Sequence, residues 1–395
     1  MPDLIKAAVL TTGRQDYGIL RSTVKLLSLD KDFELFLLVG GMHLSDRYGR
    51  TIRQIEADGL KITRTLNWMG NIDGESSVQE QSAEAIRLAS AALTELKPDF
   101  LLLAGDRFET AAAAFAAVLC RVPIVHLHGG EETEGAIDNQ LRHAITELSH
   151  VHLVSHPIHQ ARVIQMGESP ETVHVVGAPG LDNLFRSDLP AKEELESKLN
   201  VKLKSPVIIV TLHPVTAMVD ETQKAIDALL RVMDQLQATY IITLPNADTG
   251  NEFIRTSFLE WAEKHSNSRV VEALGEQGYF GLMKIADLMV GNSSSGLVEA
   301  GAYQLPVIDI GSRQRGRLRG PNVIHADLGH SSLLNAFRTA LSPEFKLSLQ
   351  GTTSPYGDGK SGQRILEILR HLSLPLSISK VFYPATSVSL VNETK

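Results

Sequence analysis

The sequence predicts an α/β protein made of two doubly wound domains, each a parallel sheet covered by helices. Two observations support this prediction. Short apolar runs rich in Val, Ile and Leu alternate with amphipathic helical segments along most of the chain, as in successive βα units. This alternation occurs in two series, which a charged, lysine-rich stretch separates. The chain has 395 residues, enough for two domains of ordinary size.

The two series define the expected domain boundaries. We expect a first domain over residues 1–186 and a second over residues 205–360, joined by a connector at residues 187–204. Residues 361–395 are expected to form a terminal helix at 361–372 and a tail, and to pack back on the first domain. The tail mixes β-branched residues with prolines, so its pattern does not decide between a packed arm and a loose end.

In the first series, each expected strand is an apolar run that ends in polar or glycine-containing residues. These strands are residues 5–10, 33–39, 60–66, 100–104, 122–125, 152–155 and 172–176. Apolar positions at helical spacing predict the helices between them, at residues 19–29, 76–96, 110–119, 141–148 and 158–166. Pro98 ends the longest of these helices.

The second series repeats the pattern with β-branched strands and amphipathic helices. Its expected strands are residues 207–212, 240–244, 270–273, 288–290 and 306–310, the last of which completes the sheet. Its expected helices are residues 221–236, 253–265, 279–285 and 297–303.

Composition and charge limit the classes of function. Apolar residues make up 43% and charged residues 21%, as in ordinary globular proteins. The net charge of −8 argues against a nucleic-acid-binding surface as the main function. The single Cys120 fits a reducing compartment, and no apolar run reaches the roughly 18 residues that span a bilayer. The N-terminus lacks a secretory signal pattern, so we expect a cytoplasmic protein without a membrane partner.

Titratable residues are concentrated after the strand at 122–125, in the sequence HLHGGEETEGAIDNQLRH of residues 126–143. Ligands bind at the C-terminal ends of strands in open α/β sheets, and paired glycines let the backbone approach a ligand closely. We therefore predict a binding or catalytic site in this stretch. The alternative is a solvated loop whose acidic residues favour a helix N-terminus.

Asp106 follows the strand at 100–104, so parallel pairing could bring it to the same pocket as Glu131. The alternative role for Asp106 is a helix N-cap. A zinc site is disfavoured, because the three histidines of the 126–143 stretch lack a helical i, i+4 pair and no cysteine joins them. Arg14 lies beside the first helix N-terminus, where it suits a phosphate or carboxylate, with a surface arginine as the alternative.

In the second series, the sequence GNSSSG of residues 291–296 joins a strand to a helix. The small residues expose backbone N–H groups, and the hydroxyls of Ser293 and Ser294 add donors, so this loop suits a phosphate. Glu299 lies within reach of a sugar hydroxyl, and Arg313 begins a run of arginines at the next strand end. The alternatives are a plain N-cap and a solvated arginine loop.

His213 stands at the end of the strand at 207–212, where Pro214 fixes the backbone; a structural histidine is the alternative. The second domain thus offers a phosphate site, and the first offers carboxylates and histidines. We expect a nucleotide-bound substrate in a cleft between the domains. Neither GxxxxGK[ST] nor GxGxxG is in place, which argues against an NTPase and a dinucleotide-dependent dehydrogenase.

Many motifs in one order identify a family resemblance: TTGRQDYG, GMHLSDRYG, GDRFET, HLHGGEETEGAIDNQLRHAIT, LHPVT, PNADTG, GNSSSGLVEAG, IGSRQRGR and PYGDGK. Over roughly residues 5–370 the chain resembles the hydrolysing UDP-N-acetylglucosamine 2-epimerases of sialic acid and related nonulosonic acid biosynthesis. The resemblance implies a GT-B-like fold, with two Rossmann-like domains and the active site in the cleft between them. It also implies a UDP-sugar substrate, no cofactor or metal, and a homodimer or homotetramer.

The resemblance implies a reaction in two stages. A carboxylate removes the C2 proton of UDP-N-acetylglucosamine while UDP leaves by anti elimination, and the 2-acetamidoglucal then adds water to give N-acetylmannosamine. The motif positions assign carboxylates of the reaction to Asp106 and Asp138 and a catalytic histidine to His213. The residues expected to bind substrate and UDP are Arg14, Arg107, His126, Ser293, Ser294, Glu299 and Arg313.

One position departs from the pattern of some family members, which read H-x-E-G-G and use that glutamate in catalysis. Here the position is His128. We expect Glu131, just after the glycines, to serve as the second carboxylate, with Glu134 behind it.

Four other functions stay open. The first is a hydrolysing 2-epimerase for a GDP- or UDP-linked diacetylated bacillosamine-type sugar, as in a legionaminic acid pathway. The others are a non-hydrolysing 2-epimerase, a glycosyltransferase of the same fold, and a non-catalytic nucleotide-sugar sensor.

Overall fold

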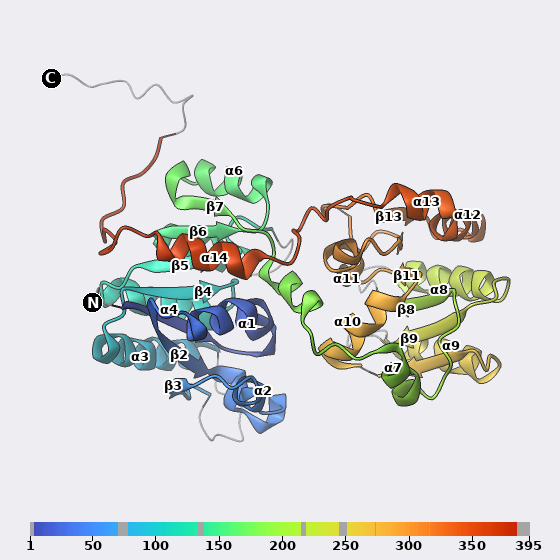
Figure 1. Cartoon of the computed structure of the whole chain (residues 1–395), viewed down its shortest axis with the longest axis horizontal. Coiled ribbons are helices and arrows are strands. Elements are labelled where there is room, and N and C mark those ends of the chain that lie inside the picture. Colours follow the sequence, from blue (N-terminus) through green and yellow to red (C-terminus); the bar gives the residue numbers. More distant parts are fainter. Residues whose placement is uncertain are drawn as a thin grey trace. The chain divides into compact units, whose positions relative to one another are not determined.

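The computed structural model describes residues 4–69, 78–132, 138–214, 219–244, 251–272, 274–315 and 317–384. The chain divides into two compact units, and the first contains both the start and the end of the chain. Unit 1 is Met1–Asn183 with Gly359–Lys395, and unit 2 is Leu184–Asp358. Each unit is a sheet with helices packed against it (Figure 1).

Unit 1 contains a parallel sheet of seven strands in the order β3-β2-β1-β4-β5-β6-β7. The strands are β1 (Ile5–Thr11), β2 (Phe33–Gly40), β3 (Ile62–Leu66), β4 (Phe100–Ala104), β5 (Ile124–Leu127), β6 (Val151–Val154) and β7 (Val173–Val175). The central strands are buried on both faces, which explains why they are continuous apolar runs rather than alternating ones.

Strand β5 begins and ends later than the sequence predicts. The expected strand covered residues 122–125, whereas the observed one includes His126 and Leu127. Val122 and Pro123 lie before the observed strand, and a buried histidine is accommodated in it because the ring has polar partners.

Helices cover both faces of the first sheet. They are α1 (Arg14–Leu29), α2 (Ile52–Ala57), α3 (Val78–Leu96), α4 (Phe108–Leu119), α5 (Asp138–Leu148), α6 (Pro157–Gln165) and α14 (Ser361–Arg370). Short 3₁₀ helices occupy Gly41–Leu44, Asp46–Tyr48, Pro170–Thr172 and Pro179–Phe185. Helices α3 and α4 share one core cluster, and α1 and α14 share another.

The terminal helix α14 is an integral part of unit 1. It lies beside α1, although almost the whole chain separates them (Figure 1). Ile365 and Leu369 bury completely in the core that contains Leu20 and Val24 of α1. The carboxylate of Asp182 fixes the start of α14 by accepting hydrogen bonds from the backbone N–H groups of residues 361 and 362, at 2.9 and 2.7 Å.

The segment that follows α14 runs over unit 1 as an ordered arm, residues 371–384. Lys380 donates to the carbonyl oxygen of Glu147 at 2.6 Å and to a carboxylate oxygen of Glu168 at 2.5 Å. The backbone N–H of Tyr383 donates to the carbonyl of Gly167 at 2.7 Å. This part of the tail is therefore a packed arm.

Unit 2 contains a parallel sheet of six strands in the order β10-β9-β8-β11-β12-β13. The strands are β8 (Val207–Thr211), β9 (Thr239–Thr243), β10 (Ser268–Val271), β11 (Leu288–Gly291), β12 (Val307–Ile310) and β13 (Val323–Ala326). The sequence did not predict β13, because the strand at 306–310 was expected to be the last of the sheet. It is a short, half-exposed edge strand, so it lacks the apolar run of a central strand.

The helices of unit 2 pack against both faces of its sheet. They are α7 (Lys192–Leu199), α8 (Val219–Met233), α9 (Asn251–Glu263), α10 (Gly275–Ile285), α11 (Ser294–Val298), α12 (His330–Leu341) and α13 (Pro343–Ser348), with a 3₁₀ helix at Ala300–Tyr303. No helix was predicted from the sequence in the regions of α12 and α13. Phe337 of α12 is nonetheless fully buried in the unit 2 core.

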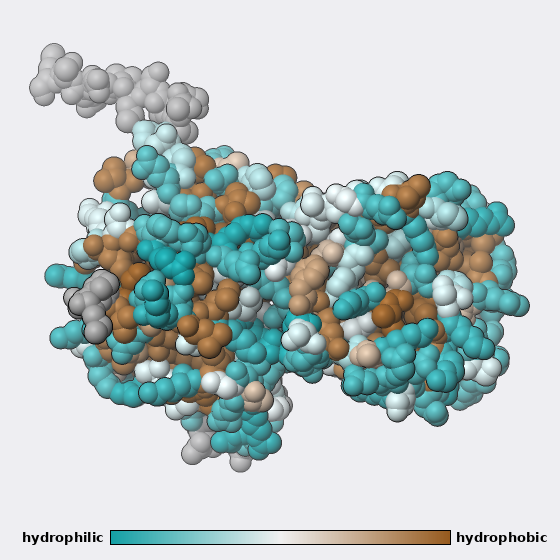
Figure 2. Space-filling view, viewed as in Figure 1, coloured by the Kyte–Doolittle hydropathy of each residue, from teal (hydrophilic) through white to brown (hydrophobic). Residues whose placement is uncertain are grey.

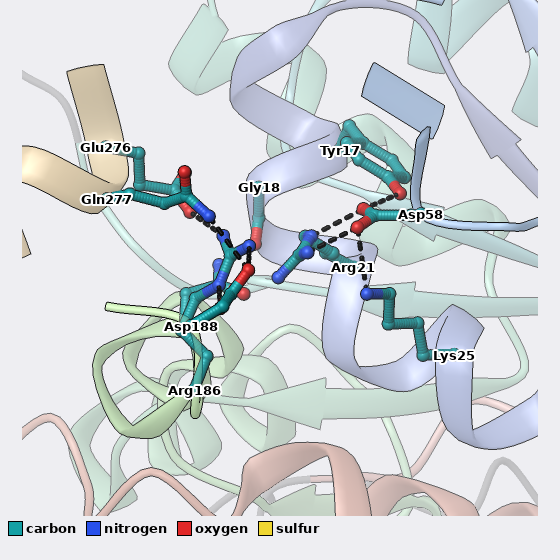
Figure 3. A network of polar contacts seen from close by, with 10 residues as sticks. Tyr17, Gly18, Arg21, Lys25, Asp58, Arg186, Asp188, Glu276 and Gln277 are labelled. Atoms are coloured by element: carbon teal, nitrogen blue, oxygen red, sulfur yellow. Dashed lines mark hydrogen bonds and ion pairs between the residues drawn. The ribbon is translucent and has the colours of Figure 1, made fainter. Parts of the chain in front are cut away.

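The stretch at 187–204, expected as a connector, contributes to the core of unit 2. Leu195 and Leu199 of α7 lie one helical turn apart and are buried against α10. A polar network anchors the preceding residues, since Arg186 pairs with Asp188 at 2.5 and 2.6 Å and with Glu276 at 3.4 Å (Figure 3). Two buried leucines in a charged helix are enough to attach it to a domain.

The surface of each unit is mixed in polarity. On the face shown in Figure 2, hydrophilic residues and apolar residues are interspersed over each unit. Among the described helices, none combines the length and the apolar character that crossing a bilayer requires.

Both sheets reverse their strand order once, between β1 and β4 in unit 1 and between β8 and β11 in unit 2. Helices leave in opposite directions at such a point, so the loops at the C-terminal ends of these strands border a crevice. The loops after β1, β4, β5, β8, β11 and β12 carry most of the residues that the sequence marks as a site.

Candidate active site

Asp106 lies in the turn between β4 and α4, at the reversal point of the first sheet. Gly105 before it has φ of +81°, which favours glycine and turns the chain out of the strand. Arg142 of α5 forms an ion pair with the Asp106 carboxylate, and its side chain is only 8% exposed. The N-cap of α4 is Arg107, so the alternative role of Asp106 as a helix N-cap is wrong.

Arg107 is held in place by its neighbour Glu109. Its Nε and Nη2 donate to the two oxygens of the buried Glu109 carboxylate at 3.1 and 3.0 Å. Burial opposes the charge of Arg107, but this ion pair raises its pKa above the ordinary value. Asp16 and Asp138 contribute to the same upward shift, so both carboxylates lie close enough to act on the guanidinium.

His126 is completely buried inside β5 and supports the Asp106 turn. Its Nε2 lies 2.8 Å from the carbonyl oxygen of Gly105, and its Nδ1 lies 3.4 Å from the hydroxyl of Thr146. Burial lowers its pKa to about 3, so the ring is neutral at physiological pH. His126 was expected to contact the substrate, but its side chain is fully buried and cannot reach a ligand. It instead holds Gly105, the residue before Asp106.

Glu131 is held by a group of polar side chains at the ends of β5 and β6. Its Oε1 lies 2.6 Å from Nδ1 of His128 and accepts a hydrogen bond from the Ser155 hydroxyl at 2.8 Å. Ser155 lies 2.9 Å from Nδ1 of His159. Burial would raise the pKa of Glu131, but His128 and Ser155 lower it to about 2, so the carboxylate is ionised.

His128 has a backbone conformation that is rare for a residue other than glycine. Its φ is +67°, in the left-handed region, where strained residues cluster at functional sites. This conformation turns the chain after β5 and directs its side chain back to Glu131. Asp138 begins α5 and is half-buried, while Glu134 lies outside the described residues.

Arg14 is the first residue of α1 and is exposed. Asp16 shapes the loop before it, because its carboxylate accepts hydrogen bonds from the backbone N–H groups of Thr12 at 2.6 Å and Gly13 at 2.8 Å. Asp16 is therefore a loop-forming residue. His43 is also structural: it is buried between the hydroxyls of Thr11 and Thr51.

In unit 2, His213 is joined to the serine loop through Asn292. The backbone N–H of His213 donates to the Asn292 side chain at 2.7 Å, and the Asn292 amide donates back to the His213 carbonyl at 2.9 Å. Arg313 and Gln314 donate to the carbonyl of Asn292 at 3.0 and 2.8 Å. The ends of β8, β11 and β12 are thus connected through one asparagine.

The turn into this serine loop requires glycine. Gly291 has φ of +141°, and a Cβ there would lie 1.8 Å from the carbonyl oxygen of Thr211. Ser293 caps α11, with its hydroxyl accepting from the N–H of Ser295 at 3.4 Å. Ser294 is the first helical residue, and both Ser293 and Ser294 are partly exposed. The loop leaves two hydroxyls near the strand end.

Glu299 carries a carboxylate oxygen that the surrounding protein leaves unbonded. Within the described residues, its Oε2 is buried and has no hydrogen-bond partner. Burial raises the pKa of Glu299, while Ser295 and Arg317 oppose this shift. Tyr279 lies near the same carboxylate, and burial raises the pKa of Tyr279 to about 12. An unbonded buried acceptor suits a hydroxyl donor from a ligand.

Comparison with known proteins identifies the family. A family model described as UDP-N-acetylglucosamine 2-epimerase matches residues 25–370. The chain belongs to this 2-epimerase family. It is 34% identical over 377 residues to the UDP-N,N'-diacetylbacillosamine 2-epimerase (hydrolyzing) of Legionella pneumophila, covering 94% of this chain and 97% of that one. It is 37% identical over 343 residues to the GDP/UDP-N,N'-diacetylbacillosamine 2-epimerase (hydrolyzing) of Campylobacter jejuni, covering 86% and 88%.

The solved structures of 2-epimerases share the fold of this family member. The UDP-GlcNAc 2-epimerase from Neisseria meningitidis, bound to UDP-GlcNAc, has a TM-score of 0.79 at 18% identity, covering 93% of this chain and 100% of that one. The predicted class, a GT-B-like protein with two Rossmann-like parallel sheets, is confirmed.

Four further residues of the candidate site were not predicted from the sequence. They are Arg142, Ser155, His159 and Tyr279. A signal existed only for Arg142, which lies one helical turn after Asp138 on the same helix. Ser155 and His159 lie outside the motifs, and the pairing of β6 with β5 brings them near Glu131. Tyr279 is on helix α10, close to Glu299. Across the described ranges, no group of three His, Cys, Asp or Glu side chains has a metal-binding arrangement.

Proposed function

We propose that this 2-epimerase family member is a hydrolysing enzyme that converts a UDP-linked 2-acetamido sugar into free UDP and the 2-epimeric sugar. The observation that carries the proposal is the set of carboxylates that follows adjacent strands of unit 1. Asp106 follows β4, and Glu131 and Asp138 follow β5, so the three approach one edge of the sheet.

These carboxylates suit the removal of a weakly acidic proton. In the proposed first step, one of them takes the proton at C2, the C–H electrons form the C1–C2 double bond, and the C1–O bond breaks with UDP leaving. In the second step, water adds its hydroxyl to C1, and a proton is delivered to C2. This proton arrives on the face of C2 opposite to the one from which the first proton was removed. A carboxylate fixed by Arg142 or His128 transfers the proton without reorganisation.

Unit 2 is proposed to hold the nucleotide. The hydroxyls of Ser293 and Ser294 and the guanidinium of Arg313 are donors for the diphosphate, and they stabilise the charge that develops as it leaves. The unbonded Oε2 of Glu299 is an acceptor for a ribose hydroxyl. We propose that Arg14 and Arg107 of unit 1 bind the anionic substrate, and that His213 acts on the leaving group. Support for these roles comes from their places at strand ends.

A UDP-linked N,N'-diacetylbacillosamine is the preferred substrate in this proposal. The two relatives that share 34% and 37% identity with this chain carry that sugar in their names. UDP-N-acetylglucosamine, the substrate that the sequence motifs favoured, is the second candidate, and the family description supports it. A homodimer or homotetramer in the cytoplasm remains part of the proposal, with light scattering as the test of assembly.

The experiment is incubation in D2O with UDP-N,N'-diacetylbacillosamine, its GDP analogue and UDP-N-acetylglucosamine, each separately. We expect free nucleoside diphosphate and free 2-epimeric sugar in equal amounts, with deuterium at C2, and the highest kcat/KM for the UDP-linked diacetylated sugar. A UDP-linked 2-epimer without free UDP would identify a non-hydrolysing epimerase. A bound but unchanged sugar without deuterium would identify a sensor, and an acceptor-dependent product would identify a glycosyltransferase.

A further inference from the structure

Two polar side chains, those of Ser155 and His159, extend behind Glu131 in a chain of hydrogen bonds within unit 1. Ser155 directly follows β6 and is almost fully buried. Its hydroxyl lies 2.8 Å from Oε1 of Glu131 on one side and 2.9 Å from Nδ1 of His159 on the other. His159 lies in the first turn of α6, with its side chain 13% exposed. Its ring is 5.9 Å from that of His156, the partly exposed N-cap of this helix.

The hydrogen atoms of this chain have a definite arrangement. The ionised Glu131 accepts, so the single hydrogen of the Ser155 hydroxyl is directed to Oε1. The Ser155 oxygen then accepts from His159, whose Nδ1 carries a hydrogen. The charged and titratable groups that act on His159 are Glu131, Arg162, His156 and His128. Burial outweighs the attraction of Glu131 and lowers the pKa of His159, so its ring is neutral at physiological pH.

We propose that Ser155 and His159 form a proton relay between solvent and Glu131. Nε2 of His159 takes up a proton from water while Nδ1 passes its proton to the Ser155 oxygen. The Ser155 hydrogen moves to Oε1 of Glu131, which becomes a neutral carboxylic acid. His159 is left neutral in its other tautomer, and the reverse sequence returns a proton to solvent.

The relay rests on the proposed function, in which hydration of the glycal needs a proton at C2 in every turnover. Glu131 is ionised in its resting state and must take up a proton before it can supply one. Its side chain is 31% exposed, and a sugar bound against that exposed side would cover it, so the proton then has to arrive from behind the carboxylate. His128 also contacts Glu131, but its Nε2 is buried and has no partner within the described part of the chain. His159 is therefore better situated for exchange with solvent.

The central test compares His159→Gln and His159→Ala with the wild type. We expect kcat to fall about 10- to 100-fold with KM within twofold, because an amide cannot exchange protons between two nitrogens. Added imidazole should restore several-fold activity in His159→Ala but not in His159→Gln, since only alanine leaves room for it. Ser155→Ala should show a similar loss without rescue, because the hydroxyl link is missing.

His156→Asn is the matched control. It lies next to the relay, and asparagine keeps the N-cap acceptor for α6, so normal kcat is expected. Unchanged UDP binding, measured by calorimetry, and an unchanged unfolding temperature verify that the His159 variants are folded.

Two results would overturn the relay: normal kcat in His159→Gln, or a loss in His159→Ala that imidazole at any concentration leaves unaltered. The failure of the proposed function is separate and visible in the wild type, which would then release no free nucleoside diphosphate from any of the three nucleotide sugars. That result would contradict the relay as well. An active wild type with fully active His159 variants would contradict the relay alone.

Discussion

At the scale of single residues, the candidate site depends on charged groups that have dedicated partners. Arg142 faces Asp106, and His128 and Ser155 face Glu131. Buried charges are tolerated only when they are paired and hydrogen-bonded, so the sequence must contain both members of each pair. They also keep a catalytic carboxylate in one position and one ionisation state.

Glu131→Gln is expected to lower kcat by roughly 10²- to 10⁴-fold, because the amide cannot transfer a proton. UDP affinity should not change, since Glu131 is not among the residues proposed to bind the nucleotide. UDP release and calorimetric titration with UDP measure the two effects. The control is Glu132→Gln, an adjacent glutamate that is 57% exposed, for which near-normal turnover is expected. Near-normal turnover of Glu131→Gln itself would refute the assignment.

Gly291→Ala is expected to distort the serine loop, because the added Cβ would meet the carbonyl oxygen of Thr211. We expect a loss of about 1–3 kcal/mol in unfolding free energy and a similar loss in UDP binding, about tenfold or more. Denaturant unfolding and calorimetry measure both. Gly180→Ala is the control, since no atom lies within 4 Å of its added Cβ. Equal behaviour of the two variants would contradict this role.

At the scale of secondary-structure elements, a group of polar side chains connects helix α1 with the end of helix α2. Figure 3 shows Asp58, which follows α2, accepting from Tyr17 and Arg21 of α1, with Lys25 also paired to it. Tyr17 and Arg21 donate at 2.6 Å each, and the Asp58 side chain is 9% exposed. Burial opposes its ionisation, but Arg21, Lys25 and Tyr17 lower the pKa of Asp58 below its ordinary value.

Asp58→Asn is expected to lower the unfolding free energy by about 3 kcal/mol at neutral pH, since it leaves Arg21 buried without its counter-charge. Because the folded pKa is depressed, the contribution of Asp58 is complete above its ordinary value of 3.8 and is lost as the pH falls further. Urea unfolding from pH 7 to pH 3 should therefore show a constant difference between the two proteins down to about pH 4, which begins to narrow below that pH. Asp46→Asn, with a side chain 82% exposed, should cost under about 1 kcal/mol.

At the scale of the whole molecule, the chain builds two sheets of the same design and returns at its end to the first. The returning segment closes unit 1 through α14 and the arm at residues 371–384. The arm reaches a buried pair, because Lys380 contacts Glu168, and Glu168 lies 3.0 Å from the fully buried His152. The end of the chain thereby neutralises a charge inside the first domain.

Lys380→Met is expected to lower the unfolding free energy of unit 1 by about 1–3 kcal/mol, because the buried Glu168 loses a donor. Thermal unfolding monitored by circular dichroism measures this loss. The exposed Lys264→Met, in unit 2, should change it by less than about 0.5 kcal/mol. Two equal melting curves would show that the arm does not stabilise the first domain.

The sequence by itself determined the alternation of strands and helices, the division into two series and the loops that hold Asp106, Glu131, Ser293 and Glu299. It could do so because apolar periodicity and glycine turns are local properties. Tertiary structure alone decided that 187–204 joins a core, that β13 is a strand, and that Arg142, Ser155 and His159 reach the carboxylates. These outcomes depend on which strands lie next to each other, and the partner of a buried charge is chosen by packing across the sheet rather than by its neighbours in the chain.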